Sequence, residues 1–101
     1  MLFHISWSIP SENRVACWNA FGKMTPEDDL KDTGEGIRVI GRWHQLGGAG
    51  GVCIAECSDA SLLNSWMLNW SPLCNLSVLP VVEDATAREN IQSKPYFEAS
   101  A

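Results

Sequence analysis

The order in which hydrophobic periodicity changes along this 101-residue chain constrains its fold more than any other feature. Apolar and polar residues alternate in four segments, which is typical of half-buried strands, and apolar residues recur at helical spacing in two others. The predicted strands span residues 2–9, 37–46, 52–57 and 75–82, and the predicted helices span residues 11–24 and 59–70. The chain therefore reads strand–helix–strand–strand–helix–strand.

Residues that favour turns and helix ends separate these segments. Pro10 ends the first strand, and Ser11 is a typical helix N-cap. The glycine-rich run at 47–51 predicts a hairpin turn between the second and third strands, and Asp59 predicts the N-cap of the second helix. Residues 25–36 are acidic and contain glycine, so we expect a solvated loop there.

The C-terminal residues form an addition to this pattern. A short third helix is expected from Asp84 to Gln92, followed by a loosely held tail. A chain of this length has room for one hydrophobic core. We therefore assign residues 1–92 to a single domain with a short C-terminal helix, and residues 93–101 to the tail.

The element order predicts an α+β fold of the ferredoxin-like βαββαβ type. In that fold the four strands are antiparallel in the order 4-1-3-2, and the helices cover one face of the sheet. Pro80 lies in the fourth strand, and proline is tolerated at a sheet edge because a missing N–H there breaks no ladder bond. The proline thus favours the order that makes strand four an edge.

Both faces of the second and fourth strands carry apolar residues. Leu79 lies opposite Leu76 and Val78 in the fourth strand, and Ile40 lies opposite Val39 in the second. A sheet covered by its own helices on one side should be polar on the other. The exposed apolar face would be buried if it packed against a second copy of the chain, so we expect a homodimer.

Charge limits the classes of partner. The chain has 7 basic and 12 acidic residues, a formal net charge of −5 and a pI of about 4.8. Nucleic-acid binding requires Lys and Arg to neutralise phosphates, so we expect no nucleic-acid partner. No apolar run reaches the length of a membrane span, and Met1–Ile5 has no signal-peptide pattern. We therefore expect no membrane association and a cytoplasmic location.

The four cysteines show no metal-binding or redox spacing. They are Cys17, Cys53, Cys57 and Cys74, and no Cys-x-x-Cys occurs. Cys53 and Cys57 lie four residues apart in a predicted strand, which is too far for a disulfide. We interpret all four as small buried hydrophobic residues.

Several segments together resemble one bacterial protein family. They are Met1-Leu2-Phe3-His4, Gly41-Arg42-Trp43-His44, Ala55-Glu56-Cys57-Ser58-Asp59, Trp66 and Trp70-Ser71. Over roughly residues 1–85 the chain is similar to the family called domain of unknown function 3303. The resemblance implies the dimeric α/β-barrel superfamily, in which two such sheets pack into one barrel, and it implies no activity.

Polar residues inside the predicted strands are the candidates for chemistry. His4 lies in the first strand, Arg42 and His44 share one face of the second, and Glu56 lies near the end of the third. Histidine and a buried carboxylate are suited to proton transfer. The face on which Glu56 lies depends on the register of the hairpin, because a slip of one residue reverses it.

Three interpretations of His4, Arg42, His44 and Glu56 are open. They form a polar set that holds the dimer, an acid–base or orienting site for a small organic ligand, or a two-histidine, one-carboxylate metal centre. The third is disfavoured because the third strand separates His4 from His44 in the expected sheet. The sequence contains no strong catalytic, metal or phosphate-binding motif, and we expect no cofactor.

Tryptophan is frequent, with five residues in this short chain. Trp7, Trp18, Trp66 and Trp70 can face the space between sheet and helices, and Trp43 shares a face of its strand with Val39. Such rings either fill the core or hold a flat aromatic ligand. The candidate pocket walls are Trp7, Trp43, Trp66 and Trp70.

Two functional hypotheses follow. One is a small dimeric domain that binds a compact, mostly apolar molecule in the cleft between helices and sheet. The other is a non-catalytic assembly domain whose polar strand residues set the geometry of the dimer. Cofactor-free monooxygenases and isomerases of the wider superfamily use this cleft, but that is an analogy of fold alone.

Overall fold

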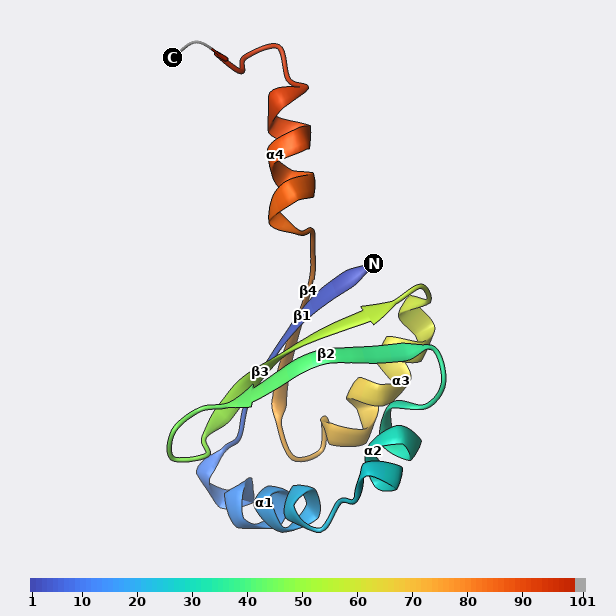
Figure 1. The fold of residues 1–101 in the computed structure, drawn as a ribbon. Helices are drawn as coiled ribbons and strands as arrows, with labels where there is room; N and C mark the ends of the chain where they lie inside the picture. The colour runs from blue at the N-terminus through green and yellow to red at the C-terminus, as the bar shows by residue number, and fades with distance from the viewer. Residues whose placement is uncertain (100–101) are drawn as a thin grey trace.

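The structure is a computed structural model that describes residues 1–99. Its four antiparallel strands form one sheet in the order β2-β3-β1-β4, which is the predicted ferredoxin-like order. The strands are β1 (Leu2–Ser8), β2 (Ile37–His44), β3 (Gly50–Cys57) and β4 (Asn75–Val81). The helices are α1 (Arg14–Gly22), α2 (Pro26–Thr33), α3 (Ala60–Trp70) and α4 (Asp84–Gln92) (Figure 1). A short 3-10 turn, Ser11–Asn13, precedes α1.

The core lies between one face of the sheet and α3. Phe3 and Ile5 project from β1 and Cys53 and Ala55 from β3, in each case at alternate positions, which is the strand period. Three residues of α3 at helical spacing pack against them: Leu63, Trp66 and Met67. All four cysteines are buried and free, as expected.

A β-bulge in β2 reverses the faces of the residues that follow it. Val39 pairs with Ala55, but the next paired residue is Gly41, so Ile40 is an extra residue in the strand. Beyond the bulge, Arg42 pairs with Cys53 and points to the helix side. The expectation that Trp43 shares a face with Val39 is therefore wrong: Trp43 pairs with Val52 and is 58% exposed.

The segment 25–36, expected to be a solvated loop, contains α2, so that expectation is wrong. Thr25 Oγ1 accepts a hydrogen bond from the Asp28 N–H at 3.2 Å, and Asp28 Oδ2 accepts one from the Thr25 N–H at 2.9 Å. This reciprocal pair is a capping box, with Pro26 at the start of the helix. The acidic run is favourable there because the helix dipole is positive at its N-terminus.

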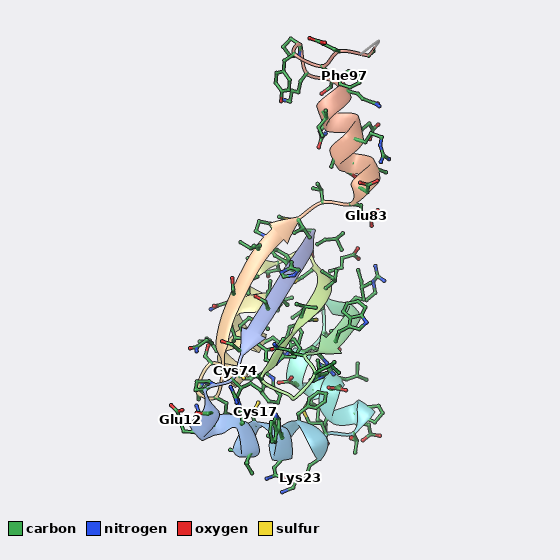
Figure 2. The ribbon with its side chains drawn as sticks, turned by 90° about the vertical axis from the view of Figure 1, so that its left-hand side faces the viewer. Glu12, Cys17, Lys23, Cys74, Glu83 and Phe97 are labelled. Atoms are coloured by element: carbon green, nitrogen blue, oxygen red, sulfur yellow. The ribbon has the colours of Figure 1, made fainter. Side chains whose placement is uncertain are left out.

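The C-terminal helix stands apart from the rest of the molecule. α4 has the predicted bounds, buries none of its side chains and projects from the end of β4. Figure 2 shows the segment from Glu83 to Phe97 extending beyond the end of the sheet. A helix of nine residues is marginal in water without a packing partner. Within residues 1–99, no helix is both long and apolar enough to span a membrane.

Candidate functional site: an aromatic cavity under the helices

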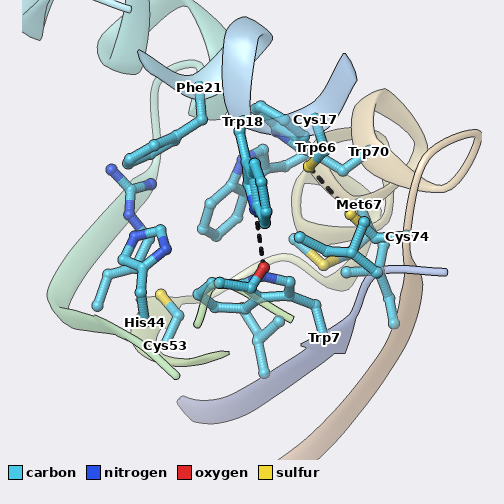
Figure 3. A pocket seen from close by; sticks show the side chains of 15 residues that line it. Trp7, Cys17, Trp18, Phe21, His44, Cys53, Trp66, Met67, Trp70 and Cys74 are labelled. Carbon is cyan, nitrogen blue, oxygen red and sulfur yellow. Dashed lines mark hydrogen bonds between the residues drawn. The ribbon is translucent and has the colours of Figure 1, made fainter. Parts of the chain in front are cut away.

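A cavity of about 180 Å³ lies between the sheet and helices α1 and α3. Its lining comes from β1, β2, β3, α1, α3 and the start of β4, so the βαββαβ topology brings distant segments together there. Five aromatic rings line this aromatic cavity (Figure 3): Trp7, Trp18, Phe21, Trp66 and Trp70. The structure thus brings three of the four candidate wall residues to one place, and Trp43 lies outside it.

Helix α2 fixes two of these rings through one carboxylate. Asp32 Oδ2 accepts hydrogen bonds from Trp66 Nε1 at 2.9 Å and from Trp70 Nε1 at 2.8 Å. Asp32 Oδ1 accepts a third from Asn69 Nδ2 at 3.0 Å. Because the indole N–H groups are bonded to Asp32, the rings offer the cavity their carbon surfaces.

Asp32 is a site residue that the sequence interpretation missed. It lies in the segment expected to be a loop, 34 and 38 residues before its two tryptophan partners. The available signal was the pair Trp66 and Trp70, which are four residues apart on one helical face and each need an acceptor when buried.

Helix α1 supplies a second wall. Trp18 Nε1 donates to the carbonyl oxygen of Gly48, in the turn between β2 and β3, at 2.8 Å. Gly48 has a φ of +76°, and a Cβ there would lie 2.8 Å from Trp18 Nε1. Glycine is therefore required at 48 both for its backbone conformation and for the approach of Trp18. Trp18 itself is 46% exposed at the edge of the cavity.

One end of the cavity is polar. Arg42 Nη2 lies 3.1 Å from Asp29 Oδ1, and the guanidinium carbon is 4.9 Å from the centre of the Phe21 ring. The His44 ring stands edge-on to Trp7, with ring centres 5.4 Å apart, and 4.8 Å from Phe21. His44 is exposed overall, so this end of the cavity is in contact with solvent.

The other end of the cavity carries sulfur. Cys17 Sγ and Cys74 Sγ lie 3.6 Å apart (Figure 3). Burial raises the pKa of the Cys74 thiol from 9.0 to about 12, with a contribution from the neighbouring Cys17. Burial also raises the pKa of Cys53, which lines the same cavity, and the positive charge of Arg42 opposes that rise. Cys53 and Cys74 are therefore protonated at neutral pH.

The other two polar candidates lie on the opposite face of the sheet. Glu56 pairs with Leu2 and Arg38 rather than with a core residue, and Arg38 Nη2 lies 3.2 Å from Glu56 Oε2. His4 pairs with Ile54 on that same face. The sheet therefore separates His4 and Glu56 from Arg42 and His44, and the four do not form one site.

No metal centre is formed by the residues described. Across residues 1–99 there is no group of three or more His, Cys, Asp or Glu side chains arranged to hold a metal ion. The two-histidine, one-carboxylate arrangement is not assembled in this chain, because His4 and His44 lie on different faces of the sheet.

The sheet face away from the helices, here called the open face, is apolar and exposed. It carries His4 and Glu56 together with five exposed apolar residues of the strands: Ile40, Trp43, Val52, Leu79 and Val81. The expectation of apolar residues on both faces of the second and fourth strands is confirmed.

The strand order and the helix-covered face define an α+β domain of the ferredoxin-like type. Within that class, the family described as Domain of unknown function (DUF3303) matches residues 1–94, and the chain belongs to it. No protein with a curated description matches the chain.

Proposed function

We propose that this domain binds a small planar aromatic molecule in the aromatic cavity. The observation that carries the proposal is a cavity of about 180 Å³ with five aromatic rings around it and Arg42 and His44 at its open end. Ligand sites are typically concave and apolar, with a few polar groups that fix orientation.

The volume limits the size of the ligand. An apolar cavity of about 150 Å³ accepts benzene, and sites for drug-sized molecules run from about 300 to 1,000 Å³. A cavity of about 180 Å³ therefore suits a single ring with one or two small substituents. The indole N–H groups of Trp18, Trp66 and Trp70 are bonded to Gly48 and Asp32, so the ring of the ligand would be held by stacking and edge contacts.

The polar end favours a ligand with a hydrogen-bond acceptor. Arg42 is paired with Asp29, which leaves guanidinium N–H groups for a further acceptor. His44 lies at the same end of the cavity, where its ring contacts those of Trp7 and Phe21 and is exposed to solvent. A phenol, a quinone or an aromatic acid combines a flat ring with such an acceptor.

Tryptophan fluorescence and thermal melting with a panel of phenols, quinones and aromatic acids test the proposal. At least one compound is expected to quench the emission and raise the melting temperature. Trp7→Phe and His44→Ala should weaken the response, whereas Trp43→Phe, which alters a tryptophan outside the cavity, should leave the affinity unchanged. A panel without any quenching or thermal shift would overturn the proposal.

A second candidate function, assembly, rests on a separate observation. We propose that a second copy of the chain covers the open face, because exposed apolar side chains run across its strands from Ile40 and Trp43 to Leu79. The projecting helix α4 follows β4 after a short connection that contains Val82, which is itself an exposed apolar residue. In a two-fold dimer, α4 of each copy would gain the packing partner that a nine-residue helix needs.

Light scattering at micromolar concentration tests the assembly proposal. The wild-type chain is expected at twice its monomer mass, and Trp43→Glu and Leu79→Glu are expected to give monomers. Val15→Glu is the matched control, because Val15 is an exposed apolar residue on α1 and away from the open face. A wild-type chain that stays monomeric argues against assembly, and it leaves the ligand proposal to its own test.

A further inference from the structure

Helix α1 is attached to the domain by few groups. Of its nine residues only Cys17 is buried. Two side-chain hydrogen bonds also hold it: Arg14 Nε, at its N-terminal end, donates to the Ile9 carbonyl at 3.0 Å, and Trp18 Nε1, near its middle, donates to the Gly48 carbonyl. The buried contact is between Cys17 and Cys74, the residue directly before β4 (Figures 2 and 3).

The two thiols of this contact are close enough to react with each other. Their sulfur atoms are 3.6 Å apart, although the residues are 57 positions apart in the chain. A disulfide bond is about 2.05 Å long, so bond formation requires a movement of about 1.5 Å. Of the two helices that line the cavity, α1 buries only Cys17 and α3 buries three residues, so a movement of α1 disturbs little of the core.

We propose that Cys17 and Cys74 form a disulfide bond under oxidising conditions and that this bond fixes α1 as a wall of the aromatic cavity. The oxidant is a small disulfide such as oxidised glutathione. One protein thiol attacks it, releases one small thiol and forms a mixed disulfide; the second protein thiol then displaces the other small thiol. The two cysteines lose two electrons and two protons in all, and one small disulfide is reduced to two thiols.

The surroundings favour a disulfide over a metal–thiolate site. Cys17 and Cys74 pack with Ile9 in an apolar cluster, where a pair of thiolates is costly to form. A disulfide is neutral and carries no such cost. The pKa of Cys74, raised to about 12, also disfavours a metal–thiolate site, because the thiol resists ionisation while α1 is in place. Reaction therefore requires α1 to move away for a moment and expose the pair.

The remaining cysteines lack this arrangement. Cys57 Sγ donates to the Asp59 carbonyl at 3.0 Å and so belongs to the turn that begins α3. Cys53 lines the cavity. Within residues 1–99, its sulfur makes no sulfur–sulfur contact like the one between Cys17 Sγ and Cys74 Sγ. The oxidation is expected to be specific for one pair of the four thiols.

The test is titration of the full chain with mixtures of reduced and oxidised glutathione, followed by alkylation under denaturing conditions and peptide mass spectrometry. The oxidised chain is expected to retain two alkylatable thiols, to lose the mass of two hydrogens and to yield a linked Cys17–Cys74 peptide. Because the link closes a long loop, the melting temperature should rise by about 10 °C and fall back on reduction.

Matched variants separate this pair from the rest. Cys53→Ser should keep both the link and the thermal shift, and Cys17→Ser and Cys74→Ser should each abolish them. A stable glutathione adduct on Cys17 or Cys74, a link between other cysteines, or four free thiols at the most oxidising mixture would overturn the proposal. Since the peptide map reads the bond directly, a variant that fails to fold does not affect the result for the wild-type chain.

Discussion

Helices α1 and α3 form two walls of the same cavity, and they are held in different ways. α3 buries Leu63, Trp66 and Met67 in the main core, and Asp32 of α2 binds two of its indoles. α1 buries Cys17 alone and depends on a few hydrogen bonds. Low burial goes with local opening, so the difference predicts one fixed wall and one that can move.

The largest expected effect comes from the fixed wall. Trp66→Ala should lower the free energy of unfolding by about 4 kcal/mol, because a large buried ring is lost and a void is left in the core. Urea denaturation measures the change. Trp18→Ala on the movable wall should cost about 2 kcal/mol, since Trp18 is half-exposed and the variant loses both its hydrogen bond to Gly48 and the packing of its ring. Equal losses in the two variants would contradict the distinction between the walls.

The second prediction concerns the carboxylate that links α2 to α3. Asp32→Ala leaves the indole N–H groups of Trp66 and Trp70 without their acceptor, and the free energy of unfolding should fall by about 3 kcal/mol. Glu27→Ala, on the same helix but exposed, is the control and should change it by less than about 0.5 kcal/mol. If Asp32→Ala behaves like Glu27→Ala, α2 does not fix the wall.

The wall that holds the core together is also the part of the site that sequence patterns describe best. The spacing of Trp66 and Trp70 places them on one side of a helix, and the alternation in residues 2–9 places Trp7 with Ile5. Pro80 and the element order are enough for the strand order that the structure shows. Helical spacing and strand alternation are regular, so the face on which each of these residues lies can be predicted from its position in the sequence.

Two irregular features were not predictable in the same way. The acidic composition of residues 25–36 favours a loop, but Thr25-Pro26-Glu27-Asp28 also fits the capping box of a helix. The reciprocal hydrogen bonds between Thr25 and Asp28 stabilise the helix there. The bulge at Ile40 adds one residue to β2, which exchanges the faces of Arg42 and Trp43. Alternation alone cannot locate a bulge, so it predicts Arg42 and His44 on the face opposite Val39, whereas the bulge brings them to the same face as Val39.

The third prediction uses pH to weaken the movable wall. The pKa of Cys74 is raised from 9.0 to about 12 in the folded state, so between these values the unfolded chain loses a proton that the folded chain keeps. The stabilisation is complete below pH 9 and is lost as pH rises towards 12. Chemical denaturation across this range should show a falling free energy of unfolding.

Other groups also titrate in that range, so the comparison needs a matched variant. Cys74→Ala has no thiol at this position, and its free energy of unfolding should fall less steeply above pH 9 than that of the wild-type chain. Identical slopes would mean that burial of this thiol does not contribute to the attachment of α1.

The smallest expected effect is the most direct measure of the movable wall. Trp18→Phe keeps an aromatic ring on α1 but removes the N–H that bonds to Gly48, which should cost about 1 kcal/mol. If α1 opens independently, this loss appears as faster hydrogen exchange in the amides of α1, about fivefold, with little change in β1 and β3. A uniform increase across helix and strands would instead show that α1 unfolds only with the whole domain, and the two walls would then be a single cooperative unit.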